Sequence, residues 1–546
     1  MTNHDWSRRR FMETGTSLLA SAVVLRPHLP ASSVPSALSA LSDFELAEWT
    51  IPQFQAAMRS GRYTSVRICQ LYLARIEAMD RKGPSLGAMI ELNPDALAIA
   101  RQLDNERKAG RVRGPLHGIP VIIKDNIATA DRMETTAGSL ALVGHRPPRD
   151  AYIARRLRDA GAVILGKTNL SEWANFRSTH SVSGWSGRGG LCRNPYALDR
   201  SPCGSSSGTG AGVSANFAAA GVGTETDGSI VCPSSANGLV GIKPTVGMVS
   251  RSGIIPISST QDTAGPMCRT VTDAAILLGV LAGADTADPA TRDSAGLIEA
   301  DYAKFLDPNG LKGARIGVAR AKFFGYSAMT DQLANDAIAA MKAQGAEIVD
   351  PADVPHVGET DDTENTVLQY EFKAGINAYL ATLGAGAPRT LADLIAFNVQ
   401  HAREEMPYFG QEVFEQSDAR GPLTEDAYQS ALANDVRLMR TEGLDALFAG
   451  KDLDAIVTPT GGPAWTTDLV NGDHFGGGSS PLAAVSGYPS VCLPIGQVFG
   501  LPVGLSFVGQ AWSEGKLIKY AYALEQALRG RKPPRFLATA DLSMPQ

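Results

Sequence analysis

Apolar positions with helical spacing predict two helices over residues 50–80. Pro52 opens the first helix, Gly61 ends it, and Thr64 or Ser65 caps the second. One face of the second helix carries an apolar stripe of Ile68, Leu71, Tyr72 and Ile76. We expect this helix pair to pack against a larger core.

Short continuous apolar runs predict strands that are buried on both faces. Residues 120–123 (PVII) form such a run after Gly118, and Lys124 stands where the strand ends. A helix predicted over 150–160 stops at Gly161 and leads into a strand at 162–165. Further elements are predicted as strand 315–319, helix 330–344, strand 347–349, a mostly helical region 358–449 and strand 454–457. This alternation indicates an α/β protein.

Residues 203–244 contain almost no charge and make a poor surface. Glycines and hydroxyl residues alternate in this stretch, and its only acidic residues are Glu225 and Asp227. The run 213–222 (Val213, Phe217, Ala218, Val222) has helical spacing, which a flexible Gly/Ser linker lacks. We therefore expect residues 203–244 to be ordered and central.

Composition excludes several classes of protein. The formal charge of −6 leaves no basic footprint for nucleic acid, so no nucleic-acid partner is expected. The six cysteines and eight histidines show neither a CxxC pair nor an HExxH motif, and we expect no metal and no cofactor. The cysteines are interpreted as small buried hydrophobic residues. A Cys192–Cys203 disulfide is the alternative in an exported protein, and spacing alone does not establish it.

The N-terminus resembles a twin-arginine export signal. Ser7-Arg8-Arg9-Arg10-Phe11-Met12 precedes a weakly apolar segment, 14–25, which is too short to span a bilayer. We expect residues 1–40 to be a signal peptide with an undetermined cleavage point, and residues 41–546 to be a periplasmic or secreted protein without membrane contact. A disordered basic tail is the alternative.

Residues 161–168 (GAVILGKT) literally fit a phosphate-binding P-loop. The four middle residues of a P-loop must form a loop, whereas residues 162–165 are strand formers and no strand precedes Gly161. We do not expect a nucleotide site here.

Residues 204–208 (GSSSG) fit the nucleophile elbow of α/β-hydrolases, with Ser206 as nucleophile. An elbow needs a strand directly before it, but Pro195 and Pro202 precede this one. It also needs a histidine, and His356, His401 and His474 all lie in uninformative contexts.

A third constellation resembles the amidase signature family. It comprises residues 118–126 (GIPVIIKDN), the Gly/Ser stretch, residues 224–230 (TETDGSI) and residues 238–245 (GLVGIKPT). The resemblance runs from about residue 50 to 528, and residues 224–230 and 490–507 are most similar to bacterial peptide amidases. It implies one large α/β/α domain with a central mixed sheet, a signature core at about 113–270 and a variable helical region at about 358–450.

The resemblance also implies catalytic residues. Carried over by motif, they are Lys124, Ser205 in a cis peptide, and Ser229 as nucleophile. Burial would lower the pKa of Lys124, which then accepts the Ser229 proton through Ser205. The backbone N–H groups of Thr226, Asp227 and Gly228 would form the oxyanion hole.

The expected function is hydrolysis of amides, such as C-terminal peptide amides, through an acyl-enzyme. Alternatives are an aryl-acylamidase or ester hydrolase with the same triad, a tRNA-dependent amidotransferase A-type subunit, and a catalytically dead binding protein. Many family members have arginine where this chain has Val231, so we expect neutral acyl groups unless Lys243 or Arg251 folds back into the pocket. The oligomeric state remains open.

Overall fold

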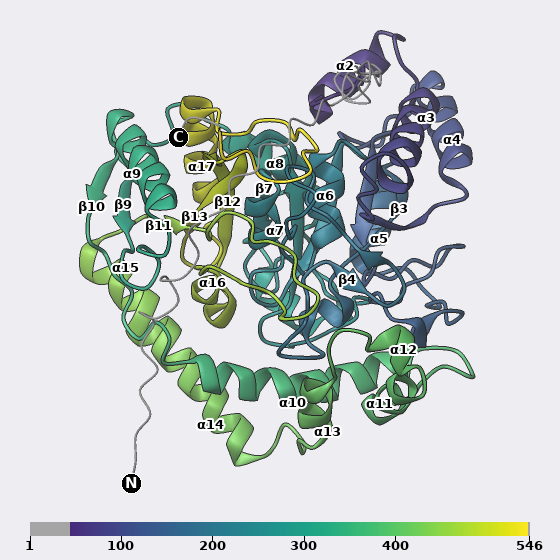
Figure 1. The fold of residues 1–546 in the computed structure, drawn as a ribbon. Coiled ribbons are helices and arrows are strands. Elements are labelled where there is room, and N and C mark those ends of the chain that lie inside the picture. Colours follow the sequence, from purple (N-terminus) through teal and green to yellow (C-terminus); the bar gives the residue numbers. More distant parts are fainter. Residues whose placement is uncertain (1–43, 544–546) are drawn as a thin grey trace, which may run out of the picture. The chain divides into compact units, whose positions relative to one another are not determined.

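An eleven-stranded mixed sheet runs through the residues that this computed structural model describes, 44–543 (Figure 1). Its strands, in spatial order, are β1 (Met89–Leu92), β3 (Val163–Thr168), β2 (Pro120–Lys124), β6 (Ala220–Glu225), β8 (Thr263–Cys268), β7 (Val240–Lys243), β12 (Ser490–Val498), β13 (Leu501–Val508), β11 (Ala455–Pro459), β9 (Arg315–Val318) and β10 (Glu347–Val349). Strand β2 is parallel to β3 and β6, and β9 is parallel to β10 and β11, while the other neighbours are antiparallel. Strands β4 (Trp185–Ser186) and β5 (Gly190–Leu191) pair separately.

Helices cover both faces of this sheet. The α-helices are α2 (Ile51–Arg59), α3 (Ser65–Ile76), α4 (Ala96–Lys108), α5 (Tyr152–Asp159), α6 (Ser207–Ser214), α7 (Val231–Ala236), α8 (Val271–Leu281), α9 (Ala328–Ala343), α10 (Asp361–Leu380), α11 (Leu391–Gln400), α12 (Ala402–Glu405), α13 (Glu412–Asp418), α14 (Asp426–Asp435), α15 (Ala446–Lys451), α16 (Pro481–Ser486) and α17 (Glu514–Leu528). Helices α6 and α7 contact each other and pack on the central strands, and α8 and α17 form a second contacting pair on those strands. The predicted α/β/α arrangement is confirmed.

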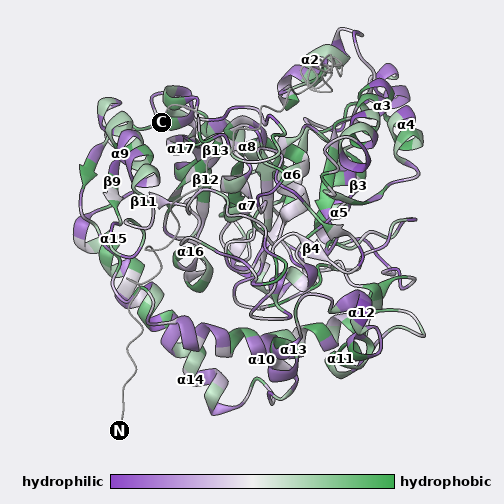
Figure 2. Cartoon of the chain, in the orientation of Figure 1, coloured by the Kyte–Doolittle hydropathy of each residue, from purple (hydrophilic) through white to green (hydrophobic). Residues whose placement is uncertain are grey.

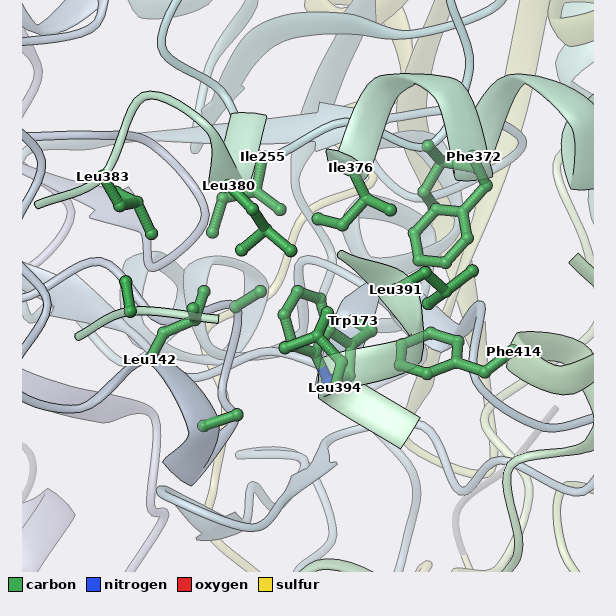
Figure 3. Packing of buried hydrophobic residues seen from close by; sticks show 14 of the residues in the cluster. Leu142, Trp173, Ile255, Phe372, Ile376, Leu380, Leu383, Leu391, Leu394 and Phe414 are labelled. Atoms are coloured by element: carbon green, nitrogen blue, oxygen red, sulfur yellow. The ribbon is translucent and has the colours of Figure 1, made fainter. Parts of the chain in front are cut away.

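The helical region after β10 packs onto the core through a buried apolar cluster. Phe372, Ile376 and Leu380 of α10 lie against Trp173 and Ile255 from the signature core (Figure 3). Purple and green alternate along α10 and α14, whereas strand β3 is mostly green (Figure 2). Both helices thus carry polar and apolar residues, and apolar residues of α10 enter the buried cluster.

Most predicted elements are confirmed. Helices α2 and α3 occupy 50–80, β2 is buried over its whole length, and α5 leads through Gly161 into β3. Strands β9, β10 and β11 and helix α9 also lie where the apolar pattern placed them.

The helical interpretation of residues 213–222 is wrong. Helix α6 begins at Ser207 and ends at Ser214, and β6 begins at Ala220. Strand β6 lies between β2 and β8 and is buried over its whole length, so it has no polar face to reveal its period. Periodicity cannot distinguish such a short apolar run from a helix.

Within the described part of the chain, residues 45–543 form one compact unit. The predicted signal segment 1–40 lies outside the described residues. No helix within the described part of the chain is both long and apolar enough to cross a bilayer.

Candidate active site

Lys124 lies at the end of β2 and is fully buried. Its Nζ donates hydrogen bonds to Ser205 Oγ at 2.7 Å, to Thr224 Oγ1 at 2.9 Å and to the Thr224 carbonyl at 3.3 Å. Burial lowers the pKa of Lys124 to about 7, against the opposing effects of the Asp262 and Glu225 charges. A substantial neutral fraction is therefore present at pH 7.

Ser205 follows a cis peptide bond with Gly204, as the family resemblance implies. Its carbonyl accepts a hydrogen bond from the Ser171 N–H at 3.0 Å. A Cβ on Gly204 would lie 2.2 Å from Ser171 Oγ, so the packing requires glycine at this position.

Ser229 lies between β6 and α7. The Ser206 N–H donates to the Ser229 carbonyl at 3.3 Å, which places the two serine segments side by side. The Glu225 carboxylate accepts from the N–H groups of Ile230 at 2.7 Å and Val231 at 3.0 Å, and so holds the start of α7. The structure thus brings Lys124, Ser205 and Ser229 into one region.

Residues 226–228 form the loop before Ser229. The Thr226 hydroxyl donates to Asp262 Oδ1 at 2.6 Å, and Gly228 has φ +78, a left-handed conformation that favours glycine. Among the described residues no backbone carbonyl is recorded as accepting from the N–H groups of Thr226 and Asp227, whereas the Gly228 N–H bonds the Glu225 carboxylate. Burial raises the pKa of Asp227 to about 6.

A pocket of about 280 Å3 opens beside both serine segments. Its walls include Gly204, Gly228, Asn175, Ser183, Asp227, Trp465, Asp473, Phe475 and Ser480. The Trp465 indole N–H donates to Asp473 at 3.0 Å, and its ring meets that of Phe475 edge to face. The described residues that line this pocket include no lysine and no arginine.

Trp465 and Phe475 are the aromatic residues among those described that line this pocket. Trp173 and Phe176 instead pack in or against the cluster of Figure 3, and Trp185 packs on Phe409.

Cys203 and Cys232 form a disulfide in the pocket wall. The alternative Cys192–Cys203 pairing is therefore wrong, because Cys192 is a free buried thiol. The interpretation as buried small residues holds for the four free cysteines. Sequence spacing could not identify the pairing, because Cys203 and Cys232 come close together only after β6 and the segments around it have folded.

The competing motifs have structural explanations. Residues 163–168 form strand β3, and Lys167 Nζ donates to the Ile127 carbonyl and to Thr135. The Ser206 hydroxyl bonds the N–H and the carbonyl of Thr224, and no strand lies directly before the 204–208 motif. These contexts exclude a P-loop and an elbow.

Three contacts of the site were not predicted from the sequence. Thr224 accepts from Lys124, Asn126 donates to the Thr224 hydroxyl at 3.0 Å, and Gln261 lies 3.4 Å from the Thr226 carbonyl. Only the position of Asn126, two residues after Lys124, was a usable signal. No cluster of three or more His, Cys, Asp or Glu residues suited to a metal ion occurs among the described residues.

Comparisons with known proteins identify the family of this chain. Residues 67–518 match the sequence profile of the family described as Amidase. A probable amidase of Arabidopsis thaliana is 43% identical over 506 residues, which cover 91% of this chain and 93% of that protein. A glutamyl-tRNA(Gln) amidotransferase subunit of Carboxydothermus hydrogenoformans is 33% identical over 498 residues, or 88% of this chain and 98% of that protein. The chain belongs to the amidase signature family and is an amidase-family enzyme.

Among solved structures, the chain is similar to the native peptide amidase of Stenotrophomonas maltophilia. The two share 54% identity with a TM-score of 0.86, covering 90% of this chain and 99% of that one. The chain is also similar to the peptide amidase PAM, solved in complex with the competitive inhibitor chymostatin, at 54% identity and a TM-score of 0.87.

Proposed function

We propose that this enzyme hydrolyses amides through an acyl-enzyme on Ser229, with Lys124 as base and Ser205 as the bridge between them. The observation that carries this proposal is the 2.7 Å hydrogen bond from a fully buried lysine to the cis-peptide serine. A serine hydroxyl is a weak nucleophile unless a base removes its proton, and a lysine can do so only when neutral.

The proposed reaction has an acylation stage and a deacylation stage. Neutral Lys124 takes the Ser205 proton while Ser205 takes that of Ser229, whose Oγ attacks the substrate carbonyl carbon. The oxyanion accepts hydrogen bonds from the N–H groups of Thr226 and Asp227. The Gly228 N–H contributes a weaker hydrogen bond, because it already donates to Glu225. The C–N bond breaks as the proton returns through Ser205 to the leaving nitrogen. Water, deprotonated by the same relay, then releases the acid and restores Ser229.

The proposed substrates are neutral amides such as C-terminal peptide amides. The pocket lining without a cation supports a neutral acyl group, and the similarity to a peptide amidase supports an amide of a peptide. An aryl-acylamidase or ester hydrolase with the same triad is the second candidate. A tRNA-dependent amidotransferase role is disfavoured by the lower identity to that relative.

A substrate panel tests this proposal. Peptide amides, aryl amides and matched esters are incubated with the enzyme, and release of ammonia, amine or alcohol is measured. Ser229→Ala is the control, and it also tests the alternative of a catalytically dead binding protein. Peptide-amide hydrolysis that is lost in this variant is expected, and hydrolysis of no amide at all by the wild type overturns the proposal.

We also propose export through the twin-arginine segment, with residues 41–546 as the mature enzyme. The Cys203–Cys232 disulfide supports this, because disulfides persist in oxidising compartments. Fractionation of cells that produce the wild type or an Arg8→Lys/Arg9→Lys variant tests it, and unchanged export of the variant contradicts it.

A further inference from the structure

Asp262 joins the loop 226–228 to the turn that precedes β8. Its Oδ1 accepts from the Thr226 hydroxyl at 2.6 Å, and its Oδ2 accepts from the N–H groups of Ile257 at 2.8 Å and Ser258 at 2.9 Å. Both oxygens are thus engaged, and one faces the residue that begins the loop. This carboxylate fixes the Thr226 side chain relative to the turn.

The neighbouring Gln261 contacts the same residue from its other side. Its Nε2 lies 3.4 Å from the Thr226 carbonyl and donates to Glu364 Oε1 of α10 at 2.8 Å. The Thr226 carbonyl and the Asp227 N–H belong to one planar peptide unit and point in opposite directions. Holding Thr226 by its hydroxyl and its carbonyl therefore sets the direction of the Asp227 N–H.

Asp262 also lies close enough to Lys124 to act on it electrostatically. Both Asp262 and Thr224, the acceptor for Lys124, line a cavity of about 10 Å3 whose walls include Ile254, Ile255 and Ile257. The same lining includes the polar and charged groups of Asn126, Glu225 and Arg251, which screen part of this interaction. Of the negative charges that favour the ammonium form of Lys124, Asp262 has the largest effect and Glu225 the next.

Two other charged groups near Asp262 have hydrogen-bond partners of their own. Arg251 faces it but is engaged with Asp288 through two hydrogen bonds of 2.7 and 2.9 Å. Glu371 of α10 accepts from Ser258 and Tyr428. Burial raises the pKa of Asp262 to about 6, so this carboxyl is ionised at pH 7 and above.

We propose that Asp262 is a positioning residue with two separable effects: through Thr226 it aims the Asp227 N–H at the oxyanion, and through space its charge stabilises the ammonium form of Lys124. This inference rests on the proposed Ser229–Ser205–Lys124 mechanism. Lys124 must hold the Ser229 proton during attack and then return it. A nearby carboxylate without a direct contact favours the protonated state and leaves Nζ free to return its proton through Ser205.

Two variants separate these effects. Asp262→Asn removes the charge, and Thr226→Val removes the hydroxyl while keeping the charge and the β-branched shape. Thr226→Ser keeps the hydroxyl and is the matched control. For each enzyme, kcat and KM for a neutral peptide amide are measured from pH 5 to 10, alongside the unfolding transition.

We expect Asp262→Asn to move the acidic limb of kcat/KM to lower pH by about 0.5–1 unit, less than for a directly contacting charge pair. Thr226→Val should lower kcat roughly tenfold, less than the loss of an oxyanion donor, with the limb unmoved. Thr226→Ser keeps the hydroxyl that donates to Asp262, so its kcat should be higher than that of Thr226→Val, with the limb unmoved. A purely structural role would lower activity without moving the limb.

A second measurement covers a variant that turns over too slowly. The rate of covalent labelling by a sulfonyl fluoride depends on the same neutral Lys124, and its pH midpoint gives the limb without turnover. If Asp262→Asn does not fold, wild-type kcat in Thr226→Val overturns the proposal and a tenfold loss with an unmoved limb supports it. An unmoved midpoint in folded Asp262→Asn overturns it as well. Ser229→Ala distinguishes a failure of the mechanism from a failure of the Asp262 proposal. Activity that survives this substitution contradicts the mechanism itself. Loss of activity together with an unmoved Asp262→Asn midpoint contradicts only the role of Asp262.

Discussion

A lysine without a carboxylate partner is an unusual occupant of a protein interior, and at Lys124 the surroundings explain its presence. Its hydrogen bonds run to Ser205 and Thr224, which are neutral acceptors. Burial penalises the ammonium form, and neutral acceptors compensate it less than a directly bonded carboxylate would. The pKa of Lys124 thus falls to about 7, where a base is useful at neutral pH.

The first prediction concerns this base. Because the neutral amine prevails above a pKa of about 7, kcat/KM should rise through that pH and fall away below it. Lys124→Met should lower kcat roughly 10²–10⁴-fold in a protein that stays folded. Lys167→Met is the matched control: Lys167 is equally buried, yet it donates to the Ile127 carbonyl and to Thr135. Near-normal turnover by Lys124→Met would falsify the triad.

The second prediction identifies the nucleophile. A sulfonyl fluoride should label Ser229, as read by peptide mass spectrometry, because the Ser206 hydroxyl is held between the N–H and carbonyl of Thr224. No histidine should be needed, so His356→Ala, His401→Ala and His474→Ala should keep their activity. A label on Ser206, or inactivation of a folded histidine variant, contradicts this.

At this scale the sequence locates reactive residues better than their partners. Lys124 is the last residue of β2, and Ser229 lies in the loop that follows β6. Both residues belong to recognisable local motifs. Thr224 and Asp262 acquire their roles from the pairing of β6 with β8, where Thr224 lies opposite Ala264 and Glu225 opposite Thr263. Such contacts arise from register, which the local pattern does not contain.

Among the elements, α/β alternation was predictable wherever strands and helices differ in length and flanking residues. The segment 207–225 shows where this fails, because both α6 and β6 are built from small residues and are wholly buried. Tight packing explains that composition: a Cβ on Gly221 would lie 2.6 Å from Thr209 of α6. Small residues let α6 pack closely on β6. Because the same residues leave no polar face on either element, the hydrophobic periodicity that would identify a helix or a strand is absent.

The third prediction concerns the Cys203–Cys232 disulfide, which ties the segment before Ser205 to α7 after Ser229. Its cysteines are 29 residues apart, so the loop-closure model gives about 3–4 kcal/mol of stabilisation. A Cys203→Ser/Cys232→Ser variant should lose about that free energy of unfolding in denaturant titrations. As a control, a dithiol reductant should destabilise the wild type and leave the variant unchanged. Equal sensitivity of both proteins to the reductant contradicts the assignment.

For the whole molecule, the helical region 361–451 is joined to the signature core by more than apolar packing. Arg177 and Glu172 are fully buried and lie 3.3 Å apart, and the Arg177 guanidinium also donates to the Glu405 carbonyl. Glu405 in turn accepts from the Leu140 N–H at 2.6 Å. The region was predictable as helical from its pattern, but these long-range contacts were not. These contacts hold the helical region against the segment that contains Trp173 and Asn175. Asn175 in turn lines the pocket.

The fourth prediction concerns the charge that the assembled pocket accepts. Neither candidate cation reaches it: Lys243 Nζ donates to the carbonyls of Pro244 and Tyr488, and Arg251 is paired with Asp288. The lining instead contains the carboxyls of Asp227 and Asp473. A substrate carboxylate would be desolvated without a partner, which costs several kcal/mol.

N-acetyl-norleucine amide and the α-amide of N-acetyl-glutamate match in side-chain length but differ in both charge and hydrophobicity, and the aspartate variants below separate the charge effect. We expect kcat/KM for the norleucine amide to be higher by roughly 10²-fold, the equivalent of about 2.7 kcal/mol. In Asp227→Asn and Asp473→Asn this ratio should shrink, because each change removes one repelling carboxyl. The ratio is internal to each enzyme, so a general loss of activity does not affect it. A preference of the wild type for the glutamate amide would show that a cation from outside the described lining reaches the bound acyl group.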